Sequence, residues 1–158
     1  MAERIECVFL TCFTAEFSML ATILQFSGIR AHRAETLEEA DFYLTVTGAT
    51  VFVTDVLFLD GNWRDALAMV AATHPVAAAL VAADEVDWPF LADAYGLGAC
   101  GVLWKPIEYS RAVESIRRLD QAAHDRAAWR AERHWSGAHS SEIKPAPALG
   151  SGARRAGE

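Results

Sequence analysis

Residues 50–55 read TVFVTD, an unbroken run of apolar and β-branched residues that ends at a single carboxylate, Asp55. Such a run is typical of a central strand buried on both faces of a parallel sheet. A second run, GACGVLWKP at 98–106, ends in a similar way, with Lys105 and Pro106 directly after the apolar residues. Two buried strands that each end at one charged residue indicate an α/β sheet whose strand ends carry the chemistry.

On either side of these runs, short apolar strands alternate with amphipathic helices. Strands are predicted at 5–10, 29–34, 50–54, 76–83 and 100–104. Helices are predicted at 15–26, 37–47, 63–73, 89–95 and from 109 to about 133. Five strands alternating with five helices imply parallel βα units with right-handed crossovers. We therefore predict a flavodoxin-like (βα)5 doubly wound α/β fold with strand order 2-1-3-4-5 and an extended C-terminal helix.

Length and composition fit one soluble domain. The chain has 158 residues, 53% of them hydrophobic, which is enough for a full core. Its net charge of −7 and the lack of a long basic run argue against nucleic acid as a partner. The N-terminus does not read as a signal peptide and no apolar stretch reaches transmembrane length, so we expect a cytoplasmic protein without a membrane partner.

The cysteines and the C-terminal composition set two further expectations. Three cysteines without CxxC or Cys/His ligand spacing support neither a disulfide framework nor a zinc site. From Trp135 on, Gly, Ser, Ala and Pro predominate, and such a segment has little to bury. We expect a core domain at 1–120, an extension of the last helix at 121–134 and a disordered tail at 135–158.

The two strand-end motifs resemble those of response regulator receiver domains, the chemotaxis-receiver-like modules of two-component signalling. VFVTD ending at Asp55 is similar to the phospho-acceptor strand, and GACGVLWKP is similar to the segment that carries the lysine–proline signature. The resemblance covers about residues 4 to 120. It implies that Asp55 is the candidate phospho-acceptor and that Lys105 pairs with a phosphoryl oxygen. It also implies a cis bond between Lys105 and Pro106.

Much of the chemistry that this resemblance implies is missing from the chain. The family holds Mg²⁺ with two acids after the first strand, where this chain has Thr11 and Cys12, neither a good ligand for a hard cation. Ala83 stands where the family has a Ser or Thr hydroxyl, and Val102 stands where it has a switching aromatic residue. We therefore regard these four as degenerate site positions.

Two other acids are candidate replacements for the missing pair. Glu16 is predicted to lie about one turn into the first helix, and Asp60 lies in the loop after the acceptor strand. Either could swing toward the crevice, but plain loss of the metal site is the simpler interpretation. We expect no cofactor and regard Mg²⁺ binding as doubtful.

Aromatic residues gather near the predicted fourth helix, fifth strand and fifth helix. Tyr95, Trp104 and Tyr109 are candidate interface residues, because receivers commonly dimerise or dock partners on that side. Ordinary core packing, with Trp104 turned inward, is the competing interpretation. We expect a protein partner, a kinase or a regulator, and we consider a homodimer through this surface.

The leading functional hypothesis is a stand-alone, atypical receiver domain that acts by protein–protein interaction and is not an enzyme. One alternative is a working receiver that a histidine kinase phosphorylates on Asp55. Another is a small flavodoxin-like enzyme or ligand-binding protein. The segment TCFTAEF after the first strand has no glycine for a phosphate-binding loop, which disfavours that last alternative.

Overall fold

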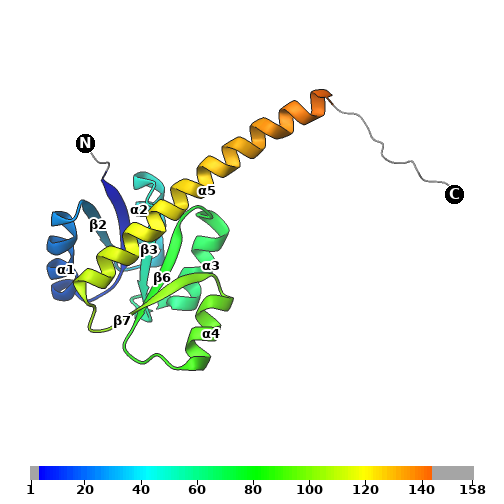
Figure 1. Cartoon of the computed structure of the whole chain (residues 1–158). Coiled ribbons are helices and arrows are strands. Elements are labelled where there is room, and N and C mark those ends of the chain that lie inside the picture. The colour runs from blue at the N-terminus through cyan, green and yellow to red at the C-terminus, as the bar shows by residue number, and fades with distance from the viewer. Residues whose placement is uncertain (1–3, 144–158) are drawn as a thin grey trace. The chain divides into compact units, whose positions relative to one another are not determined.

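The computed structural model describes residues 4–143 and contains a five-stranded parallel sheet (Figure 1). The strand order is β2-β1-β3-β6-β7, which confirms the predicted flavodoxin-like topology, since β6 and β7 are the fourth and fifth long strands. The five strands are β1 (Ile5–Leu10), β2 (Ile29–Ala34), β3 (Val51–Asp55), β6 (Ala78–Ala83) and β7 (Ala99–Trp104). All four pairings between them are parallel.

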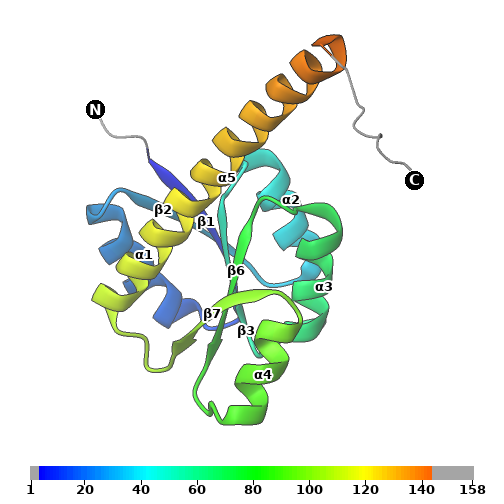
Figure 2. The same ribbon diagram turned by 45° about the vertical axis from the view of Figure 1, so that its right-hand side comes forward.

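Helices cover both faces of this sheet (Figure 2). One buried cluster joins the sheet to α1 (Thr14–Phe26) and to the first half of α5 (Tyr109–Ile143). The other joins it to α2 (Leu37–Thr47), α3 (Trp63–Thr73) and α4 (Trp88–Gly96). Every residue of β3 is buried, because this strand lies in the middle of the sheet and has helices on both sides. The long apolar run that predicted a central strand is thereby explained.

The loop predicted after β3 contains a short hairpin instead. Strands β4 (Leu57–Phe58) and β5 (Gly61–Asn62) pair in antiparallel fashion around the turn at Asp60. Phe58 is buried in the cluster with α2 and α3, and this burial fixes the hairpin on the sheet. At its end, Asn62 and Asp65 form a capping box that starts α3.

The last helix ends later than predicted. Helix α5 continues past Arg133 to Ile143, so the tail expected to be disordered from Trp135 begins inside a helix. Extending a helix needs no new nucleation, and no proline occurs in the chain between Pro106 and Pro145. Residues 144–158 of the expected tail lie outside the described residues.

Among the described residues, 4–123 form one compact unit, and those from His124 to Ile143 belong to a second. In the second unit the Trp129 side chain is half exposed, and the Arg133 guanidinium lies 4.5 Å from its ring centre. In the first unit, β2 and β7 are the two edges of the sheet. The edge strands differ in character, since β2 reads IRAHRA and β7 reads ACGVLW.

Candidate functional site

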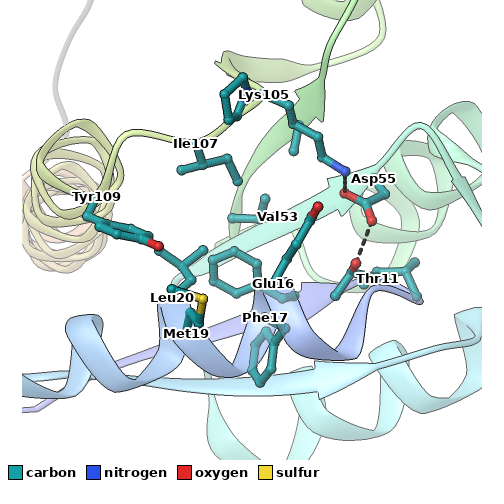
Figure 3. Close-up of a pocket in the computed structure, with 14 residues that line it drawn as sticks. Thr11, Glu16, Phe17, Met19, Leu20, Val53, Asp55, Lys105, Ile107 and Tyr109 are labelled. Carbon is teal, nitrogen blue, oxygen red and sulfur yellow. Dashed lines mark hydrogen bonds and ion pairs between the residues drawn. The ribbon is translucent and has the colours of Figure 1, made fainter.

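Asp55 ends the central strand β3, at the carboxyl edge of the sheet, and is buried there. Its Oδ1 lies 2.9 Å from the Nζ of Lys105, which follows β7 (Figure 3). Side-chain exposure is 7% for Asp55 and 20% for Lys105, so the ion pair is largely removed from water. A buried carboxylate requires such a partner, because an isolated charge in a protein interior is strongly disfavoured.

The second oxygen of Asp55 is bonded as well. Thr11 donates its hydroxyl proton to Oδ2 at 2.5 Å, and the same hydroxyl oxygen accepts from the backbone N–H of Phe13 at 3.1 Å. Strand register explains the contact: Leu10 pairs with Thr54 between β1 and β3, so the next residues, Thr11 and Asp55, come to lie opposite each other. Both oxygens of the carboxylate are therefore held by protein groups.

Small residues on β6 let Lys105 reach across to β3. Ala82 lies opposite Asp55 in the β3–β6 register and presents only a methyl group. The lysine is anchored at its backbone, where its N–H donates to the carbonyl of Ala83 at 2.8 Å, and the bond to Pro106 is cis. The Phe13 ring lies 4.6 Å from Nζ, a cation–π contact that adds to the ion pair.

The donor set at this edge does not suit a divalent metal. Thr11 is engaged with Asp55, and Cys12 is exposed and carries sulfur, a poor ligand for Mg²⁺. Within the described residues, no group of three or more His, Cys, Asp or Glu side chains is placed to hold a metal ion. Asp60 is used elsewhere, since its carboxylate accepts from the N–H of Leu37 at the start of α2.

The remaining degenerate positions lie where the sequence placed them. Ala83 is buried at the end of β6 and brings no hydroxyl to the site. Val102 is partly buried on β7 and packs against the cluster under α2, α3 and α4. Neither residue offers a group that could bond to a phosphoryl oxygen.

The candidate interface residues separate into two places. Tyr95 and Trp104 line a groove of about 720 Å³ along β7, together with Cys100, Val102 and the side chains of α5 at Arg111 and Glu114. Trp104 is 61% exposed and Tyr95 54%, so Trp104 does not pack inward under α5. Tyr109 lies apart from them, at a pocket beside Asp55.

That pocket has a volume of about 180 Å³ and lies between α1 and the loop from β7 to α5. Thr11, Asp55 and Lys105 form one side, while Phe9, Leu20, Val53 and Ile107 supply apolar walls. Figure 3 shows Glu16 pointing from α1 into the same space. The sequence had suggested Glu16 only as a replacement metal ligand.

Two contributors were missed by reasoning from sequence. Thr11 was interpreted only as a lost acid, and Phe13 was not considered. The predicted strand order already made β1 and β3 neighbours, so a hydroxyl directly after β1 could have been matched with the carboxylate that ends β3. The contact of Phe13 could not be predicted in this way. Its ring reaches Lys105 because of the conformation of the loop between β1 and α1, which residue spacing in the sequence does not determine.

No protein-family model matches the chain, and no curated protein matches it in sequence. Solved structures do match. The signal receiver domain of a putative Luxo repressor protein from Vibrio parahaemolyticus has a TM-score of 0.73 at 15% identity, over 79% of this chain and 96% of that chain. The receiver domain of an HD domain-containing protein from Pseudomonas fluorescens Pf-5 has a TM-score of 0.72 at 16% identity, over 81% and 95%.

A third match is the beryllofluoride-activated NtrC4 receiver domain dimer, with a TM-score of 0.69 at 22% identity, over 75% of this chain and 98% of that chain. The chain therefore has the fold of response regulator receiver domains, as its two strand-end motifs predicted. Within residues 4–143, no helix is both long enough and apolar enough to span a membrane.

Proposed function

We propose that this chain is an atypical receiver domain in signal transduction, which acts by binding another protein and has largely lost phosphorylation chemistry. The observation that carries the proposal is the state of Asp55. Its two carboxylate oxygens are bonded to Lys105 and Thr11, and the carboxylate is buried. It is a satisfied structural group rather than an open nucleophile.

Phosphoryl transfer to a carboxylate needs a cation that neutralises the charge on the transferring group. The two positions that would supply acids for Mg²⁺ are Thr11 and Cys12. Lys105 brings one positive charge, but the carboxylate of Asp55 already neutralises it at 2.9 Å. The relay of a phosphoryl signal would also be incomplete, because Ala83 replaces the family's Ser or Thr hydroxyl and Val102 replaces its aromatic residue. These losses support a module whose surface is fixed rather than switched, and a role other than that of an enzyme.

The surface that suits a protein partner is the groove along β7. Exposed Tyr95 and Trp104 give it large amphipathic rings, which are enriched in protein interfaces. Arg111, Glu114 and Arg118 on α5 give it both signs of charge at the rim. We propose that a kinase, a regulator or a second copy of this chain binds here. The matched NtrC4 receiver, by its description, is a dimer.

Exposure to acetyl phosphate with and without Mg²⁺ tests the loss of phosphorylation, with intact-protein mass as the readout. We expect the wild-type chain to gain no phosphoryl group and to show no saturable Mg²⁺ binding at millimolar concentrations. A double variant, Thr11→Asp with Cys12→Asp, restores two carboxylates beside Asp55 and should gain Mg²⁺ binding. Thr14→Asp with Ser18→Asp, which adds the same charge on the exposed side of α1, is the matched control.

The competing function is a working phospho-acceptor. Mg²⁺-dependent phosphorylation of the wild type that disappears in Asp55→Asn would establish it and would overturn the proposal. Unchanged mass in both proteins supports the loss of the reaction.

A further inference from the structure

The pocket between α1 and the β7–α5 loop contains apolar side chains and a carboxylate that take no part in the ion pair at Asp55. Its inner walls are apolar and come from four elements: Phe9 of β1, Leu20 of α1, Val53 of β3 and Ile107 of the loop. Tyr109 lies at the same pocket from the start of α5. Figure 3 shows Leu20, Val53 and Ile107 around a common space below Lys105. The arrangement is a concave apolar site with polar groups on one side, as small-molecule sites commonly are.

The volume fits a single aromatic ring. The pocket measures about 180 Å³, and an apolar cavity of about 150 Å³ is enough to bind benzene. Phe9 and Phe17 already pack edge to face, with ring centres 5.7 Å apart, so a flat ligand ring would meet an aromatic surface. Edge-to-face and offset contacts are the favoured arrangements of such rings.

The polar side of the pocket carries an uncompensated negative charge. Its charged lining residues are Glu16, Asp55 and Lys105, which sum to −1 when two acids and one lysine are counted. Asp55 and Lys105 neutralise each other at 2.9 Å. Among the described residues, Glu16 has no hydrogen-bond or ion-pair partner, so its carboxylate remains available at the rim.

We propose that this pocket binds a small aromatic monoamine, with the ring among the apolar walls and the ammonium group against Glu16. A single positive charge balances the pocket, whereas a carboxylate ligand would add to the negative charge. A neutral ligand would contact the same apolar walls but leave Glu16 without a partner. The proposal is independent of whether Asp55 accepts phosphate, because the amine requires neither Mg²⁺ nor a free Asp55.

Three ligands that share a phenyl ring and a short chain separate these contributions. The full chain is labelled with ¹⁵N and titrated with 2-phenylethylamine, 2-phenylethanol and 3-phenylpropionate, and backbone amide shifts are followed by NMR. We expect saturable amine binding with a dissociation constant on the order of 10⁻⁴ to 10⁻³ M, as suits so small a ligand. Affinity should fall from amine to alcohol to carboxylate, with the shifts centred on Glu16, Leu20 and Ile107.

Variants test each part of the site. Glu16→Gln should weaken amine binding about threefold and remove the preference over the alcohol, since an exposed ion pair contributes modestly. Glu38→Gln is the matched control, because Glu38 is an exposed acid on α2 and does not line the pocket. Ile107→Trp places a larger side chain in the pocket and should abolish binding of both the amine and the alcohol.

Equal affinity of the wild type for the amine and the alcohol would overturn the assignment of the ammonium group to Glu16. The same conclusion would follow if Glu16→Gln bound the amine as Glu38→Gln does. Shifts centred on residues away from α1 and the β7–α5 loop would overturn the pocket itself.

Discussion

The crevice at Asp55 lies at the carboxyl end of the central strand, whereas the groove runs along the edge strand β7. The two sites differ in how far their side chains are buried and bonded. In the crevice, the residues Thr11, Asp55 and Lys105 are buried or mostly buried and bonded to one another. In the groove, the aromatic rings of Tyr95 and Trp104 are more than half exposed. In the crevice, where the family resemblance predicts chemistry, the polar groups are buried and bonded to one another. In the groove, where it predicts protein contacts, the aromatic rings are exposed to solvent.

This difference indicates what each region contributes. A buried, bonded carboxylate stabilises the fold only while its partners remain, because removing one leaves an unpaired charge. An exposed aromatic ring contributes little to the fold and becomes valuable when a partner covers it. We therefore expect substitutions in the crevice to change stability, and substitutions in the groove to change association.

The largest expected effect is on Lys105. Lys105→Met keeps the length of the side chain but leaves Asp55 buried without its cation, so we expect the free energy of unfolding to fall by about 3 kcal/mol. This free energy is measured by urea denaturation, with circular dichroism as the readout. The control is Arg64→Met, which removes a half-exposed ion pair to Asp93 and a cation–π contact with the Trp63 ring, and should cost at most about 1 kcal/mol. Equal losses in the two variants would show that the crevice pair has no special structural role.

Trp104→Ala probes the groove. If a second copy binds there, a ring near the interface centre contributes about 2 kcal/mol, or roughly a 30-fold change in the dimer dissociation constant. Sedimentation equilibrium of both proteins measures this change, and the urea midpoint should stay near that of the wild type. A wild-type protein that remains monomeric across the micromolar range would remove the dimer from the proposal and leave a different protein as the partner. Phe26→Ala, at a largely exposed ring on α1 outside the groove, is the control.

The hydroxyl of Thr11 gives a smaller test of the crevice. Thr11→Val is nearly isosteric but leaves Oδ2 of Asp55 without its donor, so we expect a loss of about 1–2 kcal/mol. Thr22→Val removes an exposed helical hydroxyl bonded to the Ser18 carbonyl and should change stability by less than about 0.5 kcal/mol. Thermal unfolding of both variants measures the change in stability. If Thr11→Val is as stable as the wild type, water replaces the hydroxyl without cost.

Thiol labelling compares the crevice with the groove in one experiment, because Cys12 directly follows Thr11 and Cys100 lines the groove. Cys12 and Cys100 are exposed, whereas Cys7 is fully buried, and burial raises the pKa of the Cys7 thiol. A maleimide should therefore label two thiols in the native protein and the third only after unfolding. Because Cys100 lines the groove, its labelling should slow severalfold at concentrations where the chain dimerises, while that of Cys12 stays constant. Equal slowing at both thiols would place the interface elsewhere.

The strand order and the positions of Asp55 and Lys105 could be predicted from the sequence for a physical reason. A parallel sheet buried on both faces requires continuous apolar strands, and those runs mark the strands and their charged ends. The hairpin at 57–62 was not predictable in the same way, because two-residue strands carry no periodicity. Its position depends on the burial of Phe58, a tertiary contact.

The site was predicted in part. Residue type alone predicts that Thr11 and Cys12 are poor ligands for a hard cation, and this stays a prediction. The bond from Thr11 to Asp55 was missed because it depends on strand register. The end of α5 was misplaced for another reason. A composition rich in Gly, Ser, Ala and Pro from Trp135 on suggested a tail, whereas a helix that has already formed continues to Ile143.

The two edges of the sheet differ in a way that bears on how the protein behaves in concentrated solution. The edge strand β2 carries Arg30 and Arg33, charges of the kind that prevent sheets from joining edge to edge. The edge strand β7, ACGVLW, has neither a charge nor a proline to do so. A chain whose groove is uncovered would therefore tend to aggregate through β7, and a partner bound there would also act as a solubilising cover. A lysine in place of the exposed Cys100 would give the isolated chain a substitute for that cover.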